Sequence, residues 1–158
     1  MKFYIQESPN NRKNSLVYRE EEHSFDVEPR CEDGIAAVSV NCLQLKIDET
    51  GKILYACGYC PLMLHQKTKE APKKYEPQGL CVSFGEKIEQ GVSRAVTKAM
   101  GWPIYRNENK GWVCLGDPKI KGKLLIEFAP NCVAALKEEK LLAVWLRPKF
   151  VLYCWNVL

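Results

Sequence analysis

The chain has 158 residues, of which 46% are hydrophobic and 27% charged, and its net charge is +4 at pH 7. These values are ordinary for one globular domain, and the weak positive charge excludes a dedicated nucleic-acid-binding arm. No run approaches the ~18 apolar residues of a membrane helix, and the N-terminus lacks the run of about 7–15 apolar residues of a secretory signal. We therefore expect one soluble, cytoplasmic domain spanning residues 1–158, with no membrane partner.

The N-terminal part of the chain has the pattern of β structure. Two short strands are expected in residues 2–8 and 15–21, on either side of a turn-rich stretch. An acidic, exposed connection follows in residues 20–33. Residues 35–59 then alternate between apolar and polar positions around a turn that ends at Gly51, where a positive φ is needed. This pattern predicts one long β-hairpin.

The middle of the chain is expected to hold a loop followed by one amphipathic helix. Residues 65–79 contain two prolines and four lysines, a composition typical of a solvated, mobile loop. A helix is predicted over residues 84–100, because Ser83 and Glu86 have the spacing of a capping box and Gly101 is a typical residue at a helix end. The apolar residues that repeat with the helical period, and are expected to be buried, are Ile88, Val92, Ala95, Val96, Ala99 and Met100.

The C-terminal part of the chain, from residue 103 onward, has the pattern of four or five further antiparallel strands. We therefore predict an α+β domain in which a curved antiparallel sheet of about eight strands packs on the helix 84–100. This order of strands, helix and strands resembles, in topology alone, that of the Whirly-type single-strand-binding proteins. The resemblance implies a single-stranded nucleic acid as ligand.

Cys57 and Cys60 form a C-x-x-C pair, which is half of a zinc site or a dithiol redox centre. The best zinc completion would be Cys57, Cys60, His65 and Cys81. The C-G-Y-C sequence after a strand also resembles the glutaredoxin and thioredoxin active site, which implies thiol exchange, although the preceding strand here belongs to a hairpin. Residues three apart in a strand point to opposite faces, so we predict no metal and no cofactor.

The other cysteines are expected to be reduced and structural. The chain has eight cysteines, and we predict that all are free. Four lie in apolar strand contexts, where a thiol acts as a small apolar group: Cys42, Cys114, Cys132 and Cys154. The first three should react slowly with a thiol reagent.

Exposed lysines are the remaining candidates for function. Two groups are predicted to bind a ligand: Lys67, Lys69, Lys73 and Lys74, and then Lys119, Lys121 and Lys123. The aromatic residues close to them in sequence are Tyr75, Trp102, Tyr105 and Trp112. Lysines with aromatic faces would suit single-stranded nucleic acid, whereas lysines around a packed aromatic core would only keep the protein in solution.

The sequence shows no phosphate-binding glycine loop and no catalytic motif, so no catalytic residue is proposed. We predict a non-enzymatic interaction module whose partner is a protein, with single-stranded nucleic acid as the second choice. The alternative is a small enzyme or ligand binder, using a pocket between the sheet and the helix or a thiol or zinc site at Cys57 and Cys60.

Overall fold

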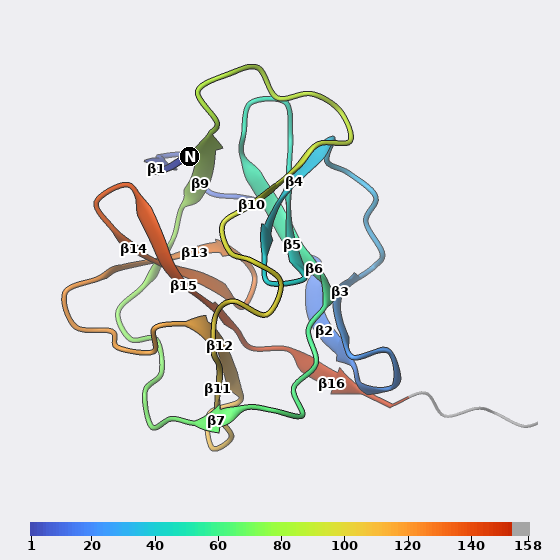
Figure 1. Cartoon of the computed structure of the whole chain (residues 1–158), viewed down its shortest axis with the longest axis vertical. Helices are drawn as coiled ribbons and strands as arrows, with labels where there is room; N and C mark the ends of the chain where they lie inside the picture. Colours follow the sequence, from blue (N-terminus) through green and yellow to red (C-terminus); the bar gives the residue numbers. More distant parts are fainter. Residues whose placement is uncertain (153–158) are drawn as a thin grey trace, which may run out of the picture.

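The computed structural model describes residues 1–152 and shows a protein built almost entirely of β-strands (Figure 1). The described residues form sixteen strands in three sheets, and their one helical segment is the 3-10 turn η1 (Glu20–Glu22). The predicted α+β fold with about eight strands is therefore wrong. None of the described residues forms a helix long and apolar enough to cross a membrane.

The first sheet comes mainly from the N-terminal half of the chain. Its strands lie in the order β10-β4-β5-β6-β3-β2-β16. Their bounds are β2 (Ser15–Arg19), β3 (Ser24–Glu28), β4 (Ala36–Val40), β5 (Leu43–Ile47), β6 (Ile53–Tyr59), β10 (Ser93–Ala95) and β16 (Lys149–Val151). From β4 to β2 all neighbours are antiparallel, as short connections allow.

The second sheet comes mainly from the C-terminal half. Its strands lie in the order β7-β11-β12-β15-β14-β13-β8. Their bounds are β7 (Gln66–Lys67), β8 (Glu76–Pro77), β11 (Ile104–Asn107), β12 (Trp112–Gly116), β13 (Leu124–Ala129), β14 (Cys132–Lys137) and β15 (Lys140–Leu146). A separate ribbon pairs β1 (Lys2–Gln6) with β9 (Gly79–Ser83).

The outermost strands of both large sheets share one property. Each edge strand, β10, β16, β7 or β8, is two or three residues long and pairs in parallel with its neighbour. Parallel pairing requires a long connection between the paired strands. Each half of the chain therefore supplies the edge strands of the other half's sheet. The edge strands β7 and β8 come before the rest of the second sheet in sequence, and β10 and β16 come after most of the first.

The two large sheets and the ribbon contribute side chains to one apolar core. In β12, Val113 and Leu115 face this core, whereas Trp112 and Cys114 face the opposite side of the second sheet. That outer side forms a second apolar cluster. Strands buried on both faces have continuous apolar sequences, and the five buried residues of β12 follow this rule.

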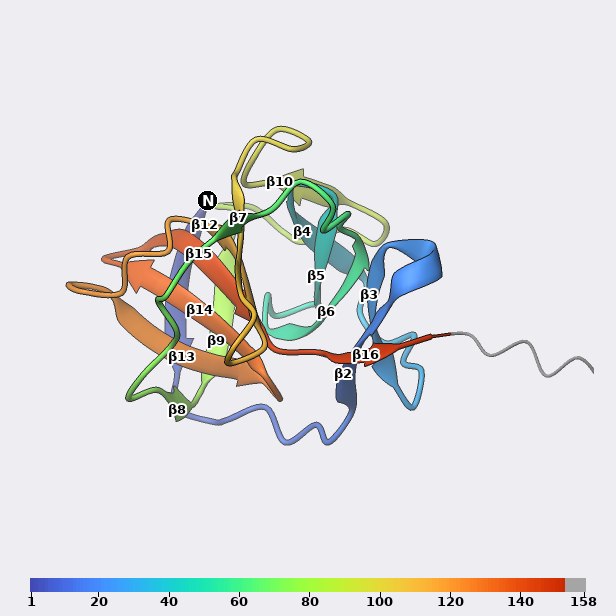
Figure 2. The same ribbon diagram turned by 90° about the horizontal axis from the view of Figure 1, so that it is seen from below.

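The predicted solvated loop 65–79 is instead a strap across the outer side of the second sheet. It forms β7 at one edge of the sheet and β8 at the other, and the segment between them crosses the sheet (Figure 2). Ala71 and Pro72 are buried, and Tyr75 packs edge-to-face on Trp112. The role of this strap could not be recognised from the sequence, because its lysines are exposed to water while the small apolar residues between them cover the sheet.

Within the predicted hairpin 35–59, the turn at Gly51 is confirmed: Gly51 has a φ of 88°, and β5 and β6 pair antiparallel on either side of it. An added Cβ at this glycine would lie 2.2 Å from the Val82 carbonyl oxygen, so the turn has no room for a side chain. The first arm is not one strand. It breaks at Asn41, whose φ is 55°, and forms the two paired strands β4 and β5.

The predicted helix 84–100 is absent. Gly85 and Gly91 adopt positive φ values of 76° and 80°, which a right-handed helix does not allow. The Ser83 hydroxyl accepts a hydrogen bond from the Gly85 N–H (3.2 Å) and closes a turn rather than a capping box. The topological resemblance to Whirly-type proteins depended on this helix and is not supported.

Backbone pairing with β4 explains why residues 84–100 do not form a helix. The Val92 carbonyl accepts from the Ala37 N–H (3.0 Å), and the Val96 N–H donates to the Ser39 carbonyl (2.8 Å). These bonds give the edge of β4 a partner, which a helix could not do. The apolar residues then divide: Ile88 and Val96 pack against the core, whereas Ala95, Ala99 and Met100 are exposed. The pocket expected between helix and sheet is lost with the helix.

Candidate binding site

A surface groove lies between β7 and the hairpin of β11 and β12, which are neighbours at the lower end of Figure 1. Its volume is about 470 Å³. One wall is residues 67–69 and the other is residues 106–110. The groove therefore joins part of the strap to a hairpin almost forty positions later in the chain.

Asn107 holds the two walls together. Its side chain is 5% exposed, and its amide nitrogen donates to the carbonyls of Lys69 (3.3 Å) and Glu70 (3.0 Å). Its amide oxygen accepts from the Lys110 N–H (3.1 Å). The Thr68 N–H also donates to the Arg106 carbonyl (3.0 Å). Asn107 therefore adds a buried side-chain link to the backbone pairing of β7 with β11, and both set the spacing of the groove.

The groove is strongly basic. Three lysines line it, Lys67, Lys69 and Lys110, and are called the groove lysines below. Arg106 adds a fourth positive charge, and among the described lining residues Glu108 is the single carboxylate. Within residues 1–152 none of the groove lysines has a carboxylate within ion-pair distance. Like charges gathered in one hollow favour an anionic ligand.

Glu108 and Arg106 already have partners of their own. The Glu108 carboxylate is 3.3 Å from Nε2 of His65, whose Nδ1 is 2.8 Å from the Leu62 carbonyl oxygen. The Arg106 guanidinium lies over the ring of Phe150 at 5.1 Å from its centroid. Arg106 is therefore packed on Phe150, whereas the groove lysines are exposed and have no ion pair among the described residues.

The structure separates the lysines that the sequence grouped together. Lys67 and Lys69 line the groove, whereas Lys73 and Lys74 are exposed farther along the strap. Lys110 and Arg106 complete the basic set. Sequence reasoning missed Arg106 as a groove residue, because only the parallel pairing of Arg106 with Lys67 brings the two charges together.

The second predicted group, Lys119, Lys121 and Lys123, lies outside the groove. Lys119 and Lys121 are exposed in the loop between β12 and β13. The Lys123 side chain is 6% exposed, and its Nζ bonds to the carboxylate (3.1 Å) and the carbonyl (2.9 Å) of Asp117. Lys123 therefore fastens its own loop and is unavailable to a ligand.

The aromatic residues near these lysines are packed against other side chains. Trp112 and Trp145 are buried and meet edge-to-face, while Tyr75 and Tyr105 pack against the same outer cluster. The Arg147 guanidinium lies over the Trp112 ring, 4.8 Å from its centroid. No aromatic residue lines the groove in the described part of the chain, so the groove lacks the stacking faces that single-stranded nucleic acid uses.

The candidate zinc ligands do not form a cluster. Cys57 packs half-buried on the outside of the first sheet, whereas Cys60 belongs to the main core. His65 is held by Glu108, and Cys81 lies in β9, where its thiol contacts the Gln6 side chain (3.5 Å). Within residues 1–152 no three His, Cys, Asp or Glu side chains are grouped as a metal ion would require.

The thiols of the C-x-x-C pair are in environments that disfavour thiolate chemistry. Burial raises the pKa of Cys60 to about 12 and also raises the pKa of Cys57. Thiol exchange requires a thiolate near neutral pH, so both thiols are poorly suited to it. Burial also raises the pKa of Cys114 and Cys132, while Cys42 is half-buried and Cys154 lies outside the described residues. The seven described cysteines are unpaired.

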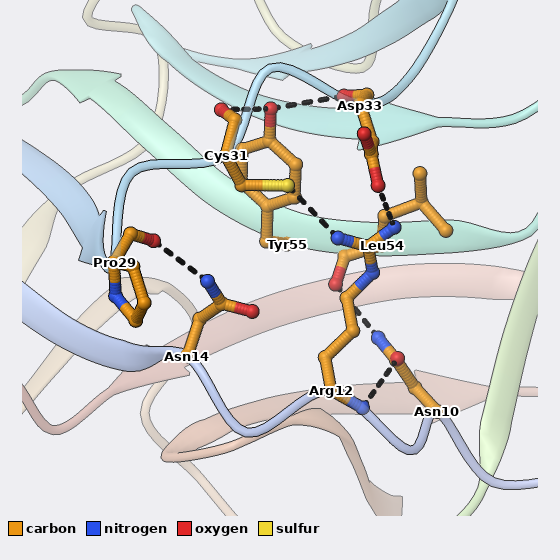
Figure 3. Close-up of polar contacts among 8 residues, drawn as sticks. All are labelled: Asn10, Arg12, Asn14, Pro29, Cys31, Asp33, Leu54 and Tyr55. Carbon is orange, nitrogen blue, oxygen red and sulfur yellow. Dashed lines mark hydrogen bonds and ion pairs between the residues drawn. The ribbon is translucent and has the colours of Figure 1, made fainter.

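A second polar cluster surrounds Arg12 on the outside of the first sheet (Figure 3). The Arg12 guanidinium donates to the Cys31 sulfur (2.9 Å) and to the Asp33 carboxylate (2.8 Å), and it lowers the pKa of that carboxyl. The Tyr55 hydroxyl donates to the carbonyls of Cys31 and Asp33, both at 2.9 Å. Burial raises the pKa of Tyr55 to about 12. Sequence reasoning missed this cluster, whose members lie in three separate segments.

The same region joins the two large sheets. The Asn10 amide donates to the carbonyls of Leu54 in β6 (2.7 Å) and Phe128 in β13 (3.1 Å). Figure 3 shows Asn10 and Arg12 reaching from one extended segment toward β6. Within residues 1–152 no buried side-chain nitrogen or oxygen lacks a hydrogen-bond partner, and the contacts of this cluster link three segments of the chain.

Comparison with known proteins gives no relative: no protein-family model matches the chain, and no curated protein or solved structure matches it either.

Proposed function

We propose that this protein is a non-enzymatic binding module that takes an acidic segment of a partner protein into its basic groove. The observation that carries the proposal is the set of groove lysines, three cations that converge on one hollow without an ion-pair partner among the described residues. Keeping like charges together costs free energy, and a carboxylate-rich ligand removes that cost.

A protein segment suits the groove better than single-stranded nucleic acid does. Both ligands are anionic, but nucleic acid bound in single-stranded form gains much of its affinity from stacking on aromatic faces. The aromatic residues near the groove are packed into the outer cluster. An acidic peptide needs only the charges and the polar groups of the groove walls, all of which are present.

Charge reversal in the groove tests the proposal. Fluorescence anisotropy would measure the binding of a labelled glutamate-rich peptide and of a labelled mixed-sequence DNA strand with the same number of charges. The double variant Lys67→Glu/Lys110→Glu should weaken peptide binding by roughly tenfold or more, because attraction becomes repulsion at two positions. Raising the salt concentration should weaken wild-type binding as well.

The matched variant, Lys119→Glu/Lys121→Glu, changes the net charge by the same amount outside the groove. It should bind the peptide within about twofold of the wild-type protein, because exposed charges beyond the Debye length are screened. Equal losses in the two variants would mean that only net charge matters and would contradict the proposal. Tighter binding of the DNA strand than of the peptide would replace the protein partner by nucleic acid.

A further inference from the structure

We infer that the backbone of the acidic segment lies beside the groove, as an added β-strand along the open edge of β7, so that its carboxylates reach Lys67 and Lys69 from that side and an apolar residue of the segment lies against Met63 and Leu64. This inference rests on the function proposed above and specifies the conformation and the chemistry of the partner segment. It draws on three features of residues 63–69 that are independent of one another: a free strand edge, an exposed apolar pair and the spacing of two lysines.

The free edge follows from the hydrogen bonding of β7. This strand is the last one in the second sheet, and it pairs on one side with β11, Gln66 opposite Tyr105 and Lys67 opposite Arg106. The Thr68 N–H donates to the Arg106 carbonyl, so Gln66 and Thr68 direct their backbone groups toward β11. In a strand the backbone groups of successive residues point to opposite sides. The N–H and C=O of Lys67 therefore point away from the sheet, where an added strand could meet them.

The apolar pair comes directly before this edge. Met63 is 71% exposed and Leu64 is 88% exposed. They form the tip of a turn that is anchored by the buried Leu62, whose carbonyl oxygen contacts the His65 ring. Adjacent large apolar side chains held in water beside a charged groove are typical of an interaction surface.

The lysine spacing matches an extended ligand. β7 ends at Lys67 and Lys69 follows two residues later; both side chains line the groove, so they lie on the same side of this segment, as the period of an extended chain allows. A partner strand has the same period, so two carboxylates separated by one residue would face both lysines. The segment that fits is therefore extended, with alternating acidic residues on one part and a large apolar residue on the part that meets Met63 and Leu64.

Two other edge strands are less suited to the same use. β8 contains Pro77, which has no N–H to donate to an added strand. β10 contains Arg94, whose guanidinium already pairs with Glu86 and lies over the Phe84 ring. Among these three edges, and as far as residues 1–152 show, β7 alone combines a free backbone donor with unpaired cations and an exposed apolar pair.

A peptide set with altered backbones tests strand addition directly. Labelled nonapeptides would carry three glutamates and two leucines in every order on a serine and threonine background, and the tightest binder would then be N-methylated at alternate amides in each of the two registers. Methylation removes a backbone donor without changing any side chain. One register should lose roughly tenfold or more in affinity, and the other should stay within about twofold, because only one set of amides faces β7.

The apolar contact is tested on the protein. Met63→Ser/Leu64→Ser should lower the affinity for the same peptide roughly fivefold to tenfold, whereas the matched change of two exposed apolar residues elsewhere, Met100→Ser/Leu124→Ser, should not alter it. Equal binding by both methylated registers would disprove strand addition while leaving the groove intact, provided Lys67→Glu/Lys110→Glu still weakened binding by roughly tenfold or more. Failure of every peptide to bind would overturn both the inference and the proposed function.

Discussion

Arg12 and the groove lysines are two different uses of positive charge in one molecule. The Arg12 guanidinium meets Cys31 and Asp33 within hydrogen-bond distance and lies over the Tyr55 ring, 5.8 Å from its centroid. The groove lysines meet no carboxylate in residues 1–152. A cation that finds its counter-charge within the chain fastens two segments together. Cations that have no counter-charge within the described chain, but are held beside one another by the backbone, remain available to bind an anionic ligand.

The structural role of the buried Asn107 amide in the groove can be tested by removing it. Asn107→Ala removes the partner of the Lys69 and Glu70 carbonyls and of the Lys110 N–H. We expect the free energy of unfolding to fall by about 2–3 kcal/mol, because three partly buried polar contacts are lost together. Affinity for the acidic peptide should fall as well, because the two walls keep only their backbone pairing and lose the side-chain link.

The neighbouring change Asn109→Ala is the control for this prediction. Asn109 lines the same groove but is exposed and forms no such bridge. Chemical denaturation should show a change of no more than about 0.5 kcal/mol. If the two asparagine variants were equally stable, the walls would not depend on Asn107, and the groove would need another explanation.

Removing the Arg12 side chain should lower the stability of the protein without changing its affinity for the acidic peptide. Arg12→Ala is expected to lower the free energy of unfolding by about 1–2 kcal/mol, because the half-buried guanidinium loses two hydrogen bonds and its packing on Tyr55. Peptide affinity should stay at the wild-type value. Denaturation and anisotropy measured on the same preparation would show whether the two effects separate.

The pH dependence of this cluster has a definite sign. Arg12 lowers the pKa of Asp33 in the folded protein from its ordinary value of 3.8. A carboxyl with a lowered folded pKa adds stability above its unfolded pKa, and this contribution is lost as the pH falls through the folded value. The stability difference between the wild-type protein and Asp33→Asn should therefore be constant from pH 7 to about pH 5 and shrink at lower pH. A difference that grew in acid would contradict the ion pair.

Local patterns in the sequence were a reliable guide where a turn needs a particular residue. Gly51 is required by its positive φ and by the close Val82 carbonyl, and the turn that it ends was predicted. The burial of Cys114 and Cys132 also followed from their apolar neighbours. The break at Asn41 was missed, because its side chain bonds to the backbone of Trp102, a contact between distant residues.

The failed helix shows why the rest could not be predicted. Residues 84–100 have a helical apolar period and a plausible cap, but Gly91 was the signal against a helix, and its N–H donates to the Ile35 carbonyl. The unpaired backbone edge of β4 favoured an extended conformation of residues 93–95, and the sequence of residues 84–100 alone does not show that such an edge is present. The groove was only half predictable for the same reason. Lys67 and Lys69 were chosen from sequence, but the pairing of β7 with β11 places Arg106 beside them.

Removing one groove lysine should have the smallest effect on stability, and it tests most directly the distinction between Arg12 and the groove lysines. Lys67→Ala should change the free energy of unfolding by no more than about 0.5 kcal/mol, because the exposed ammonium has no ion-pair partner in the described part of the chain. The change should even be slightly favourable at low salt, where repulsion among the groove lysines is least screened. Affinity for the acidic peptide should nevertheless fall several-fold, roughly as expected for one lost charge pair. Lys137→Ala, an exposed lysine at the end of β14, is the matched control and should change neither quantity. A loss of stability in Lys67→Ala as large as that in Arg12→Ala would show that this lysine fastens the fold as Arg12 does, and the distinction between the two kinds of cation would fail.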